Sequence, residues 1–370
     1  MSLIPGNMSQ QQGTKSNPVG KIKTRNAIYP ILIGLGVVGW MLYKDFDPDV
    51  FSSITFSWST LFWLFVAFLC MFGRDLGYII RIKVFSGGQL SWVQAFRIIM
   101  LWEFTSAITP SAVGGTSVAI LYIHKEGISI GKSSAMVMLT SFFDELYFVV
   151  MFPLMVLAVG RTQLFDLSNV SGSVLSMSLM TVALIGYFLK LVWTLILSYG
   201  LFINPRGLKW LLLKIFKIRP LRRWYRAIND VGSDIILSSR ELKTKGFGFW
   251  LKSFLSTFLS WSSRYLVANA LIMAFFGYTD QLLLFARQLV MWIMMLIMPT
   301  PGGSGFAEYI FTHFLGDLMP VAPELQVAAG TLVAVVWRLV TYYPYLIIGA
   351  ILFPRWLNTH FSRRAFKKKA

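Results

Sequence analysis

Long apolar runs alternate with short polar breaks along most of the chain. The runs fall at about 27–43, 59–80, 93–109, 116–123, 133–159, 175–198, 248–277, 282–298, 304–316 and 325–352. Several of them have the roughly 20 residues that a helix needs to cross a bilayer core. Only helices and closed barrels satisfy their backbone hydrogen bonds in lipid, and these run lengths fit helices. The pattern therefore predicts an all-α polytopic membrane protein.

Two runs are interrupted by a proline and a glycine pair. The breaks are Pro110 with Gly114 and Gly115 in the first half, and Pro299 with Gly302 and Gly303 in the second. Proline removes a backbone donor and glycine loosens the chain, so each helix is expected to break there. Irregular backbone at membrane depth is tolerated only beside protein or a water-filled cavity. We therefore predict two re-entrant hairpins, near 93–124 and 282–316, and about six full spans.

The distribution of basic residues tests this arrangement. The segments that it places in the cytoplasm carry 25 Lys and Arg residues, whereas the outer loops carry only Lys44 and Arg161. Cytoplasmic loops of membrane proteins are enriched in Lys and Arg. The asymmetry favours the hairpin arrangement with both termini in the cytoplasm.

The hairpins then enter the membrane from opposite sides, so the two halves are expected to be inverted repeats. The spacing Arg97-x4-Trp102-x7-Pro110 matches Arg287-x4-Trp292-x6-Pro299. After each break, Gly114-Gly115-Thr116-x-x-Ala119 matches Gly302-Gly303-Ser304-x-x-Ala307. Inverted repeats with discontinuous helices characterise many secondary transporters.

Composition narrows the class further. The chain has 370 residues, 56% hydrophobic and 14% charged, with a formal net charge of +18. A soluble domain has about 25% charged residues, so a soluble globular protein is excluded. The positive charge fits cytoplasmic loops that face anionic lipid better than it fits nucleic acid, and no nucleic-acid partner is expected. The single cysteine, Cys70, lies in an apolar run, so no disulfide framework is expected.

The organisation follows from these runs. We expect a disordered cytoplasmic tail at 1–25, a first membrane half at 26–198, a basic linker at 199–247, a second membrane half at 248–354 and a basic tail at 355–370. Within the linker, leucines recur at helical spacing among basic residues from Arg206 to Lys217. The linker fits either an ordinary positive-inside segment or an interfacial helix that captures anionic headgroups.

Ionisable residues within the spans are the main candidates for function, because burying them in a bilayer is costly. Asp144, Glu145, Glu308 and Arg338 each lie in or beside an element that follows a break. If the repeat holds, Asp144 or Glu145 lies opposite Arg338, as a structural pair or as a pair that opens for a charged headgroup.

Other charged residues have simpler explanations. Arg97, Lys190 and Lys252 can extend toward the membrane surface, and Arg74 and Asp75 can neutralise one another. We keep Arg74, Glu103, Arg264 and Arg287 as secondary site candidates.

The breaks supply a second candidate element. Half-helices that begin at Gly115 and Ser304 would point free amides toward the bilayer midplane, which suits a phosphate or carboxylate. Thr116 and Ser304 add hydroxyl donors, although such hydroxyls also satisfy freed backbone groups. The predicted substrate-binding residues are therefore Pro110, Gly114, Gly115, Thr116, Asp144, Glu145, Pro299, Gly302, Gly303, Ser304, Glu308 and Arg338.

Sequence motifs for catalysis are missing from the chain. The three histidines show no ligand spacing, and there is neither a P-loop nor a serine-nucleophile motif. We expect no catalytic residue, no metal, no cofactor and no enzyme activity.

Two segments carry a resemblance to a known family. The first runs from Leu90-Ser91-Trp92 through Pro110-Ser111-Ala112-Val113-Gly114-Gly115 to Gly127-Ile128-Ser129. The second is Pro299-Thr300-Pro301-Gly302-Gly303-Ser304-Gly305-Phe306-Ala307-Glu308 with Arg338 to Tyr343. Over roughly residues 25–355 the chain resembles the flippase-like membrane domain of lysylphosphatidylglycerol synthase and its stand-alone relatives.

The resemblance implies a multi-pass protein of a bacterial or archaeal cytoplasmic membrane that moves lipids between leaflets or aids envelope-lipid modification. Family members tend to carry a Glu-Arg pair in the span after the first hairpin, whereas this chain has Phe142-Phe143-Asp144-Glu145-Leu146. The missing arginine implies that this chain recognises a different headgroup from the family members that carry the pair. We expect no aminoacyl-transfer domain and no lysylphosphatidylglycerol synthesis.

Three functions remain open from the sequence. The favoured one is a flippase in which an anionic or zwitterionic lipid headgroup crosses through a midplane cavity. The others are a small-anion secondary transporter and a scaffold that presents lipid to a separate envelope-lipid synthase. The expected partners are membrane lipids, with a second copy of the chain or such a synthase left open.

Overall fold

The fold is known from a computed structural model that describes residues 57–109, 111–165, 173–218, 242–295 and 306–361, with single positions between 222 and 240. In these ranges all regular structure is helical, as predicted. The long helices are α3 (Trp58–Ser86), α6 (Ile130–Val159), α8 (Ser173–Ser198) and α11 (Phe247–Phe275). The expected disordered tail at 1–25, the run at 27–43 and the end of the basic tail lie outside the described residues.

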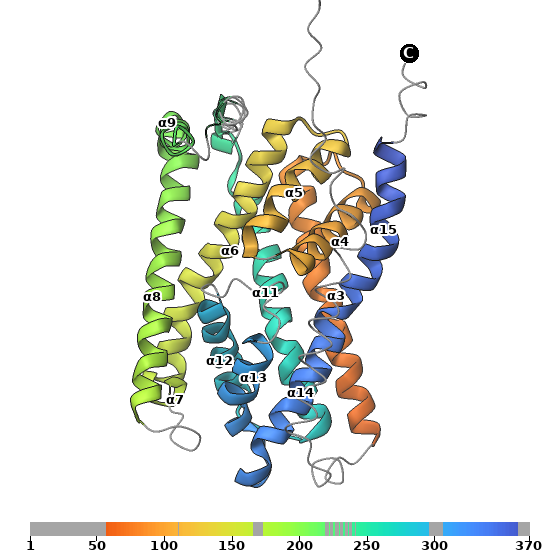
Figure 1. Ribbon diagram of the computed structural model, residues 1–370, viewed down its shortest axis with the longest axis vertical. Helices are drawn as coiled ribbons and strands as arrows, with labels where there is room; N and C mark the ends of the chain where they lie inside the picture. Colours follow the sequence, from red (N-terminus) through yellow and green to blue (C-terminus); the bar gives the residue numbers. More distant parts are fainter. Residues whose placement is uncertain are drawn as a thin grey trace, which may run out of the picture.

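Shorter helices complete the bundle (Figure 1). They are α4 (Trp92–Ile108), α5 (Ser111–Lys125), α7 (Arg161–Phe165), α9 (Pro205–Ile215), α12 (Gln281–Met294), α13 (Phe306–Leu315), α14 (Gln326–Thr341) and α15 (Tyr343–Phe361), with a π-turn at Tyr199–Ile203 and 3-10 turns at Gly316–Leu318 and Pro323–Leu325.

Four helical stretches of the described chain are long and apolar enough to cross a bilayer. They are Trp58–Ser86, Ile130–Val159, Met180–Ile203 and Pro323–His360. Many of their large apolar side chains are exposed, as expected for surfaces that face lipid. The protein is therefore a multi-pass all-α membrane protein.

The two short helix pairs lie in opposite halves of the bundle (Figure 1). Helices α4 and α5 lie in the upper half, near the C-terminal end of α15. Helices α12 and α13 lie in the lower half, near α7 and the N-terminal end of α14. Polar caps begin both pairs, because Ser91 forms a capping box with Gln94, and Asp280 accepts from the amides of Leu282 and Leu283.

The helices α3 and α11 approach each other closely. A methyl group on Gly77 would lie 2.6 Å from the Ser256 carbonyl oxygen and 2.9 Å from the Ser260 nitrogen. The Ser260 hydroxyl donates to the Arg74 carbonyl at 2.9 Å. Small and hydroxyl residues let membrane helices pack backbone to backbone, which explains the serine-rich sequence of α11.

The first break differs in detail from the prediction. Thr109 is extended at φ −105° and ψ 140°, as expected for a residue before proline, but the next helix begins at Ser111 and not at Gly115. A helix can restart directly after a proline because its first turn needs no amide partner. Gly115 lies inside α5, where a side chain would overlap Ser106 of α4. Its role is therefore close packing within the hairpin.

One predicted span boundary is also wrong, and one predicted span is interrupted within the stretch that the structure confirms. The span expected to end at residue 80 continues to Ser86, which places Arg81 inside the bundle. The span expected at 325–352 divides at Tyr342 into α14 and α15. The second half-helix begins at Phe306, two residues beyond the expected Ser304, which lies outside the described residues.

We predict that Gly77→Ala lowers the midpoint of thermal unfolding in detergent, because its new methyl group would meet backbone atoms that cannot move aside. Overpacking of this kind costs about 1–3 kcal/mol. Gly248→Ala on the same helix pair is the control, since a methyl group there meets nothing within 4 Å. An equal midpoint for the two variants would contradict this account of the α3–α11 contact.

Candidate functional site

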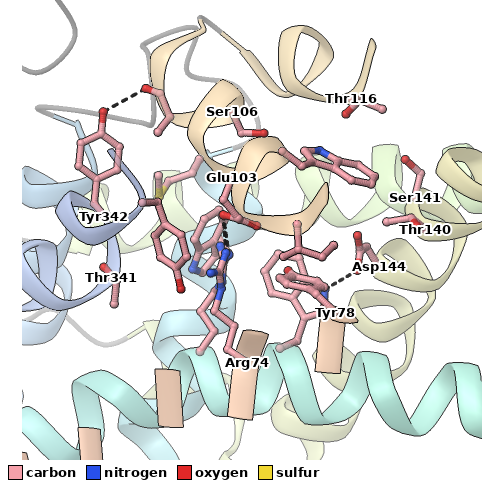
Figure 2. Close-up of a pocket in the computed structure, with 18 of the residues that line it drawn as sticks. Arg74, Tyr78, Glu103, Ser106, Thr116, Thr140, Ser141, Asp144, Thr341 and Tyr342 are labelled. Carbon is pink, nitrogen blue, oxygen red and sulfur yellow. Dashed lines mark hydrogen bonds and ion pairs between the residues drawn. The ribbon is translucent and has the colours of Figure 1, made fainter. Parts of the chain in front are cut away.

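A cavity of about 420 Å³ lies inside the bundle and is lined by side chains from nine helices. Trp102 of α4 and Trp292 of α12 both line it, so it lies between the two short helix pairs. Figure 2 shows its charged and hydroxyl side chains converging from several helices. Its charged lining residues are Arg74, Arg81, Glu103, Asp144, Glu145, Lys190, Arg264 and Arg338.

The cluster around Arg74 forms one wall of the cavity. Arg74 is 2% exposed and pairs with Asp75 at 2.9 Å and with Glu103 of α4 at 2.5 Å. Its guanidinium also lies 4.7 Å from the ring centroid of Tyr345, whose hydroxyl donates to both Asp75 oxygens. Two carboxylates and an aromatic face therefore neutralise and hold this arginine.

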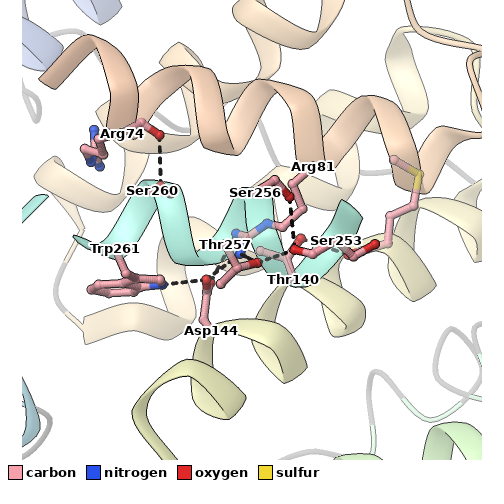
Figure 3. Close-up of polar contacts among 10 residues, drawn as sticks. Arg74, Arg81, Thr140, Asp144, Ser253, Ser256, Thr257, Ser260 and Trp261 are labelled. Carbon is pink, nitrogen blue, oxygen red and sulfur yellow. Dashed lines mark hydrogen bonds and ion pairs between the residues drawn. The ribbon is translucent and has the colours of Figure 1, made fainter. Parts of the chain in front are cut away.

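Asp144 is held by α3 and α11 (Figure 3). Arg81 donates to its two oxygens at 2.5 and 3.3 Å, and the indole of Trp261 donates to Oδ1 at 2.7 Å. Arg81 also donates to the Thr257 hydroxyl at 3.0 Å. Asp144 of α6 is therefore paired with an arginine from another helix.

Glu145, one residue further along α6, has a separate partner. Lys190 of α8 donates to its Oε2 at 2.8 Å and lies 4.2 Å from the ring centroid of Phe148. Lys190 is buried, so the expectation that it extends to the membrane surface is wrong. The carboxylate keeps the lysine in the bundle because each neutralises the other.

Arg338 and Glu308 form another buried pair, with Nε and Oε1 2.7 Å apart. The predicted pairing of Arg338 with Asp144 or Glu145 is therefore wrong, although all three residues line the cavity. The sequence places these residues at the right depth, but helix rotation determines which charges meet.

Arg264 of α11 differs from the other cavity cations. Its guanidinium lies 4.9 Å from the ring centroid of Trp261 and 4.8 Å from that of Trp292. Its contact with a carboxylate is long, at 3.9 Å from Nη2 to Glu103 Oε2. That distance is too great for a hydrogen bond. Its position is set by the two aromatic faces.

The cavity brings together most of the predicted charged residues. Of the predicted set, Thr116, Asp144, Glu145, Arg338, Arg74, Glu103 and Arg264 line it, and Glu308 pairs with Arg338. Arg287 lies elsewhere and pairs with Asp317 at 2.6 and 2.7 Å. Gly114 lies within α5, while Pro110, Pro299, Gly302, Gly303 and Ser304 lie outside the described residues.

Sequence reasoning missed several cavity residues. Arg81 was expected in a cytoplasmic loop, and Lys190 was expected at the surface. Trp261, Trp292 and Tyr345 were not among the predicted site residues, although the matching positions of Trp102 and Trp292 in the two halves were a usable signal. In the described ranges no group of three His, Cys, Asp or Glu residues could hold a metal ion.

The bundle and its charged cavity define a polytopic membrane protein with an internal polar site. Residues 27–349 match the family described as the lysylphosphatidylglycerol synthase TM region, and the chain belongs to this family. It is also similar to a UPF0104 membrane protein of Archaeoglobus fulgidus, with 26% identity over 337 residues that cover 87% of this chain and 94% of the relative. No solved structure gives a significant match.

We predict that Glu308→Gln lowers the unfolding midpoint strongly, because it leaves Arg338 charged and buried. Removing one partner of a buried pair costs about 3–5 kcal/mol. Thermal unfolding in detergent provides the measurement. The double variant Glu308→Gln, Arg338→Met should recover part of the loss. A double variant less stable than Glu308→Gln would contradict the pairing.

Proposed function

We propose that the protein is a flippase, which passes the anionic or zwitterionic headgroup of a phospholipid through the cavity while the acyl chains stay in the bilayer. The observation that carries this proposal is the cavity itself. Its volume of about 420 Å³ lies in the range of small-molecule sites. Ionisable residues in membrane proteins commonly mark substrate pathways.

The arrangement of the two hairpins supports alternating access. Arg97 pairs with Glu126 at 2.8 Å and joins the two ends of the first hairpin, while Arg287 and Asp317 do the same in the second. The hairpins lie in opposite halves of the bundle (Figure 1). These features fit two inverted repeats around a central site, as in many secondary transporters.

The ends of the bundle support an orientation. Helix α9 lies at the same end as the C-terminal end of α15 (Figure 1), and both are followed by basic residues. Leu208 of α9 is buried, whereas Trp210, Leu211 and Ile215 are exposed. A helix with this pattern beside basic residues suits a surface of anionic lipid. We place this end, with both termini, in the cytoplasm of a bacterial or archaeal cell.

The test is lipid exchange in liposomes with reconstituted protein. Acyl-labelled phosphatidylglycerol, phosphatidylethanolamine and polyprenyl phosphate are supplied separately, and transfer between leaflets is followed by quenching of the label from outside. We expect at least one lipid to cross faster than in protein-free liposomes. Correctly folded protein that accelerates none of them contradicts the proposal, and uptake of a small anion without lipid exchange would identify a solute transporter instead.

A variant links the exchange to the cavity. Ser141 of α6 lines the cavity, so Ser141→Trp should fill it and lower the exchange rate by about tenfold or more. Leu157→Trp on the same helix is the control, because Leu157 is 81% exposed. Equal rates for the two variants would place the lipid pathway elsewhere or favour a scaffold without transport.

The orientation of the hairpins has its own test. In a Cys70→Ala background, single cysteines replace Lys125 after the first hairpin and Glu324 beyond the second. Glu324 is exposed and avoids the Asp317 ion pair. A membrane-impermeant thiol reagent should label the two cysteines from opposite sides of the membrane. Labelling of both from one side would exclude the inversion.

A further inference from the structure

Arg264 holds the loosest ion pair of the cavity. Its guanidinium lies beside two tryptophan rings that meet edge to face. The side chain is 15% exposed, and its nearest carboxylate oxygen is 3.9 Å away. The described residues offer this guanidinium no hydrogen-bond acceptor, although arginine carries five N–H donors. A planar guanidinium held by aromatic faces is suited to a phosphate.

Arg74 occupies the corresponding position in the first half of the chain. The same spacing of 190 residues separates Arg74 from Arg264, Arg97 from Arg287, and Trp102 from Trp292. The helices also meet at matching residues, because a methyl group on Gly73 would lie 2.9 Å from Oγ of Ser263. Contact between equivalent residues is expected where a two-fold axis passes between two copies.

The two equivalent arginines differ in their partners. Arg74 binds two carboxylates at hydrogen-bonding distance and is 2% exposed. Arg264 approaches only Oε2 of Glu103, the same oxygen that Arg74 already holds at 2.5 Å. One copy is thus neutralised within the protein, and the other keeps its donors directed at the cavity.

Glu103 supplies the complementary charge. It is 24% exposed and lines the cavity, and both of its cationic contacts reach Oε2. Its Oε1 accepts no hydrogen bond from the described residues. A carboxylate can accept about four hydrogen bonds through its two oxygens. Glu103 therefore has capacity for an ammonium group next to the donors of Arg264.

Among the described residues, the charges around the cavity balance. Five cations line it, namely Arg74, Arg81, Lys190, Arg264 and Arg338, and they face the five carboxylates of Asp75, Glu103, Asp144, Glu145 and Glu308. Residues 296–305, which connect α12 to α13, carry no charge. A guest with a net charge would leave one charge uncompensated at low dielectric, whereas a zwitterion would not.

We infer that the cavity selects a zwitterionic phosphate ester, which inserts between Arg264 and Glu103 with its phosphate on Arg264 and its ammonium group on Glu103. The net charge of the cavity is then the same with and without the bound headgroup. The inference rests on the proposed function and names the headgroup class. The same chemistry occurs in an aminoalkyl phospholipid and in its free headgroup.

Binding is tested apart from transport. Detergent-purified protein is titrated with glycerophosphoethanolamine, which is zwitterionic, and with glycerophosphoglycerol, which is anionic, and thermal stabilisation is measured. We expect the zwitterion to stabilise the protein at concentrations at least about tenfold lower than the anion. Equal potency, or preference for the anion, would overturn the inference.

Three variants test which residue binds the phosphate and which binds the ammonium group of the ligand. Arg264→Gln should weaken binding of both ligands at least about tenfold, because it removes a charged hydrogen-bond donor, and Arg264→Lys should retain part of it. Glu103→Gln should lose the preference for the zwitterion and bind the anion better than wild type does, because the cavity then carries one excess positive charge. The control is Lys252→Gln on α11, which removes an exposed cation and should change neither affinity. An unchanged preference in Glu103→Gln would contradict the ammonium site.

Liposomes distinguish the two sources of the headgroup and separate the inference from the proposed function. Faster exchange of phosphatidylethanolamine than of phosphatidylglycerol supports both the flippase and the zwitterion preference. Uptake of labelled glycerophosphoethanolamine without lipid exchange supports the recognition chemistry and overturns the flippase. Equal exchange of both lipids that Arg264→Gln leaves unchanged overturns the recognition chemistry and keeps the flippase.

Discussion

Charge placed inside an apolar bundle must be neutralised locally, and this constraint shapes the structure more than any other. An isolated ion in the membrane interior costs several kcal/mol, so each buried arginine or lysine lies near a carboxylate or an aromatic face. Arg74, Arg81 and Lys190 all follow this rule with partners on other helices or beside them. The ion pairs therefore neutralise buried charges and also connect neighbouring helices.

The position of the cavity follows from the same pairing. Helix α3 carries Arg74 and Arg81 two turns apart, and each reaches a carboxylate on a different helix, α4 or α6. These long side chains reach from α3 to the neighbouring helices and line the cavity. The space that remains is lined by charged and hydroxyl side chains among apolar ones, and residues of α4, α5 and α12 contribute to its wall.

The sequence predicts the class of fold and the residues that matter better than it predicts their contacts. Apolar run lengths and the proline breaks predict the helices, because hydrophobic thickness and the missing proline amide act locally. The partners of Asp144, Glu145 and Arg338 could not be predicted, because they depend on the rotation and crossing of several helices. The role of Gly115 was predicted wrongly for a related reason. This residue lies inside a helix and allows close packing against Ser106, and it does not break the helix.

Arg264 shows what a comparison of the two halves can add. Its equivalence with Arg74 could be found from the 190-residue spacing in the sequence, but the difference between them required the structure. Arg74 is held by two carboxylates, whereas Arg264 lies over two tryptophans and has its nearest carboxylate oxygen 3.9 Å away. Under the proposed recognition chemistry, the equivalent position would serve folding in one half and headgroup binding in the other.

The central claim is that a lipid headgroup occupies the cavity between the two hairpins. The most direct measurement is an electron cryomicroscopy map of the protein in nanodiscs that contain an aminoalkyl phospholipid. The account predicts headgroup density beside Arg264 and Glu103, with acyl chains that leave toward the bilayer. A cavity filled by the protein's own side chains, with every lipid confined to the outer surface of the bundle, would contradict it.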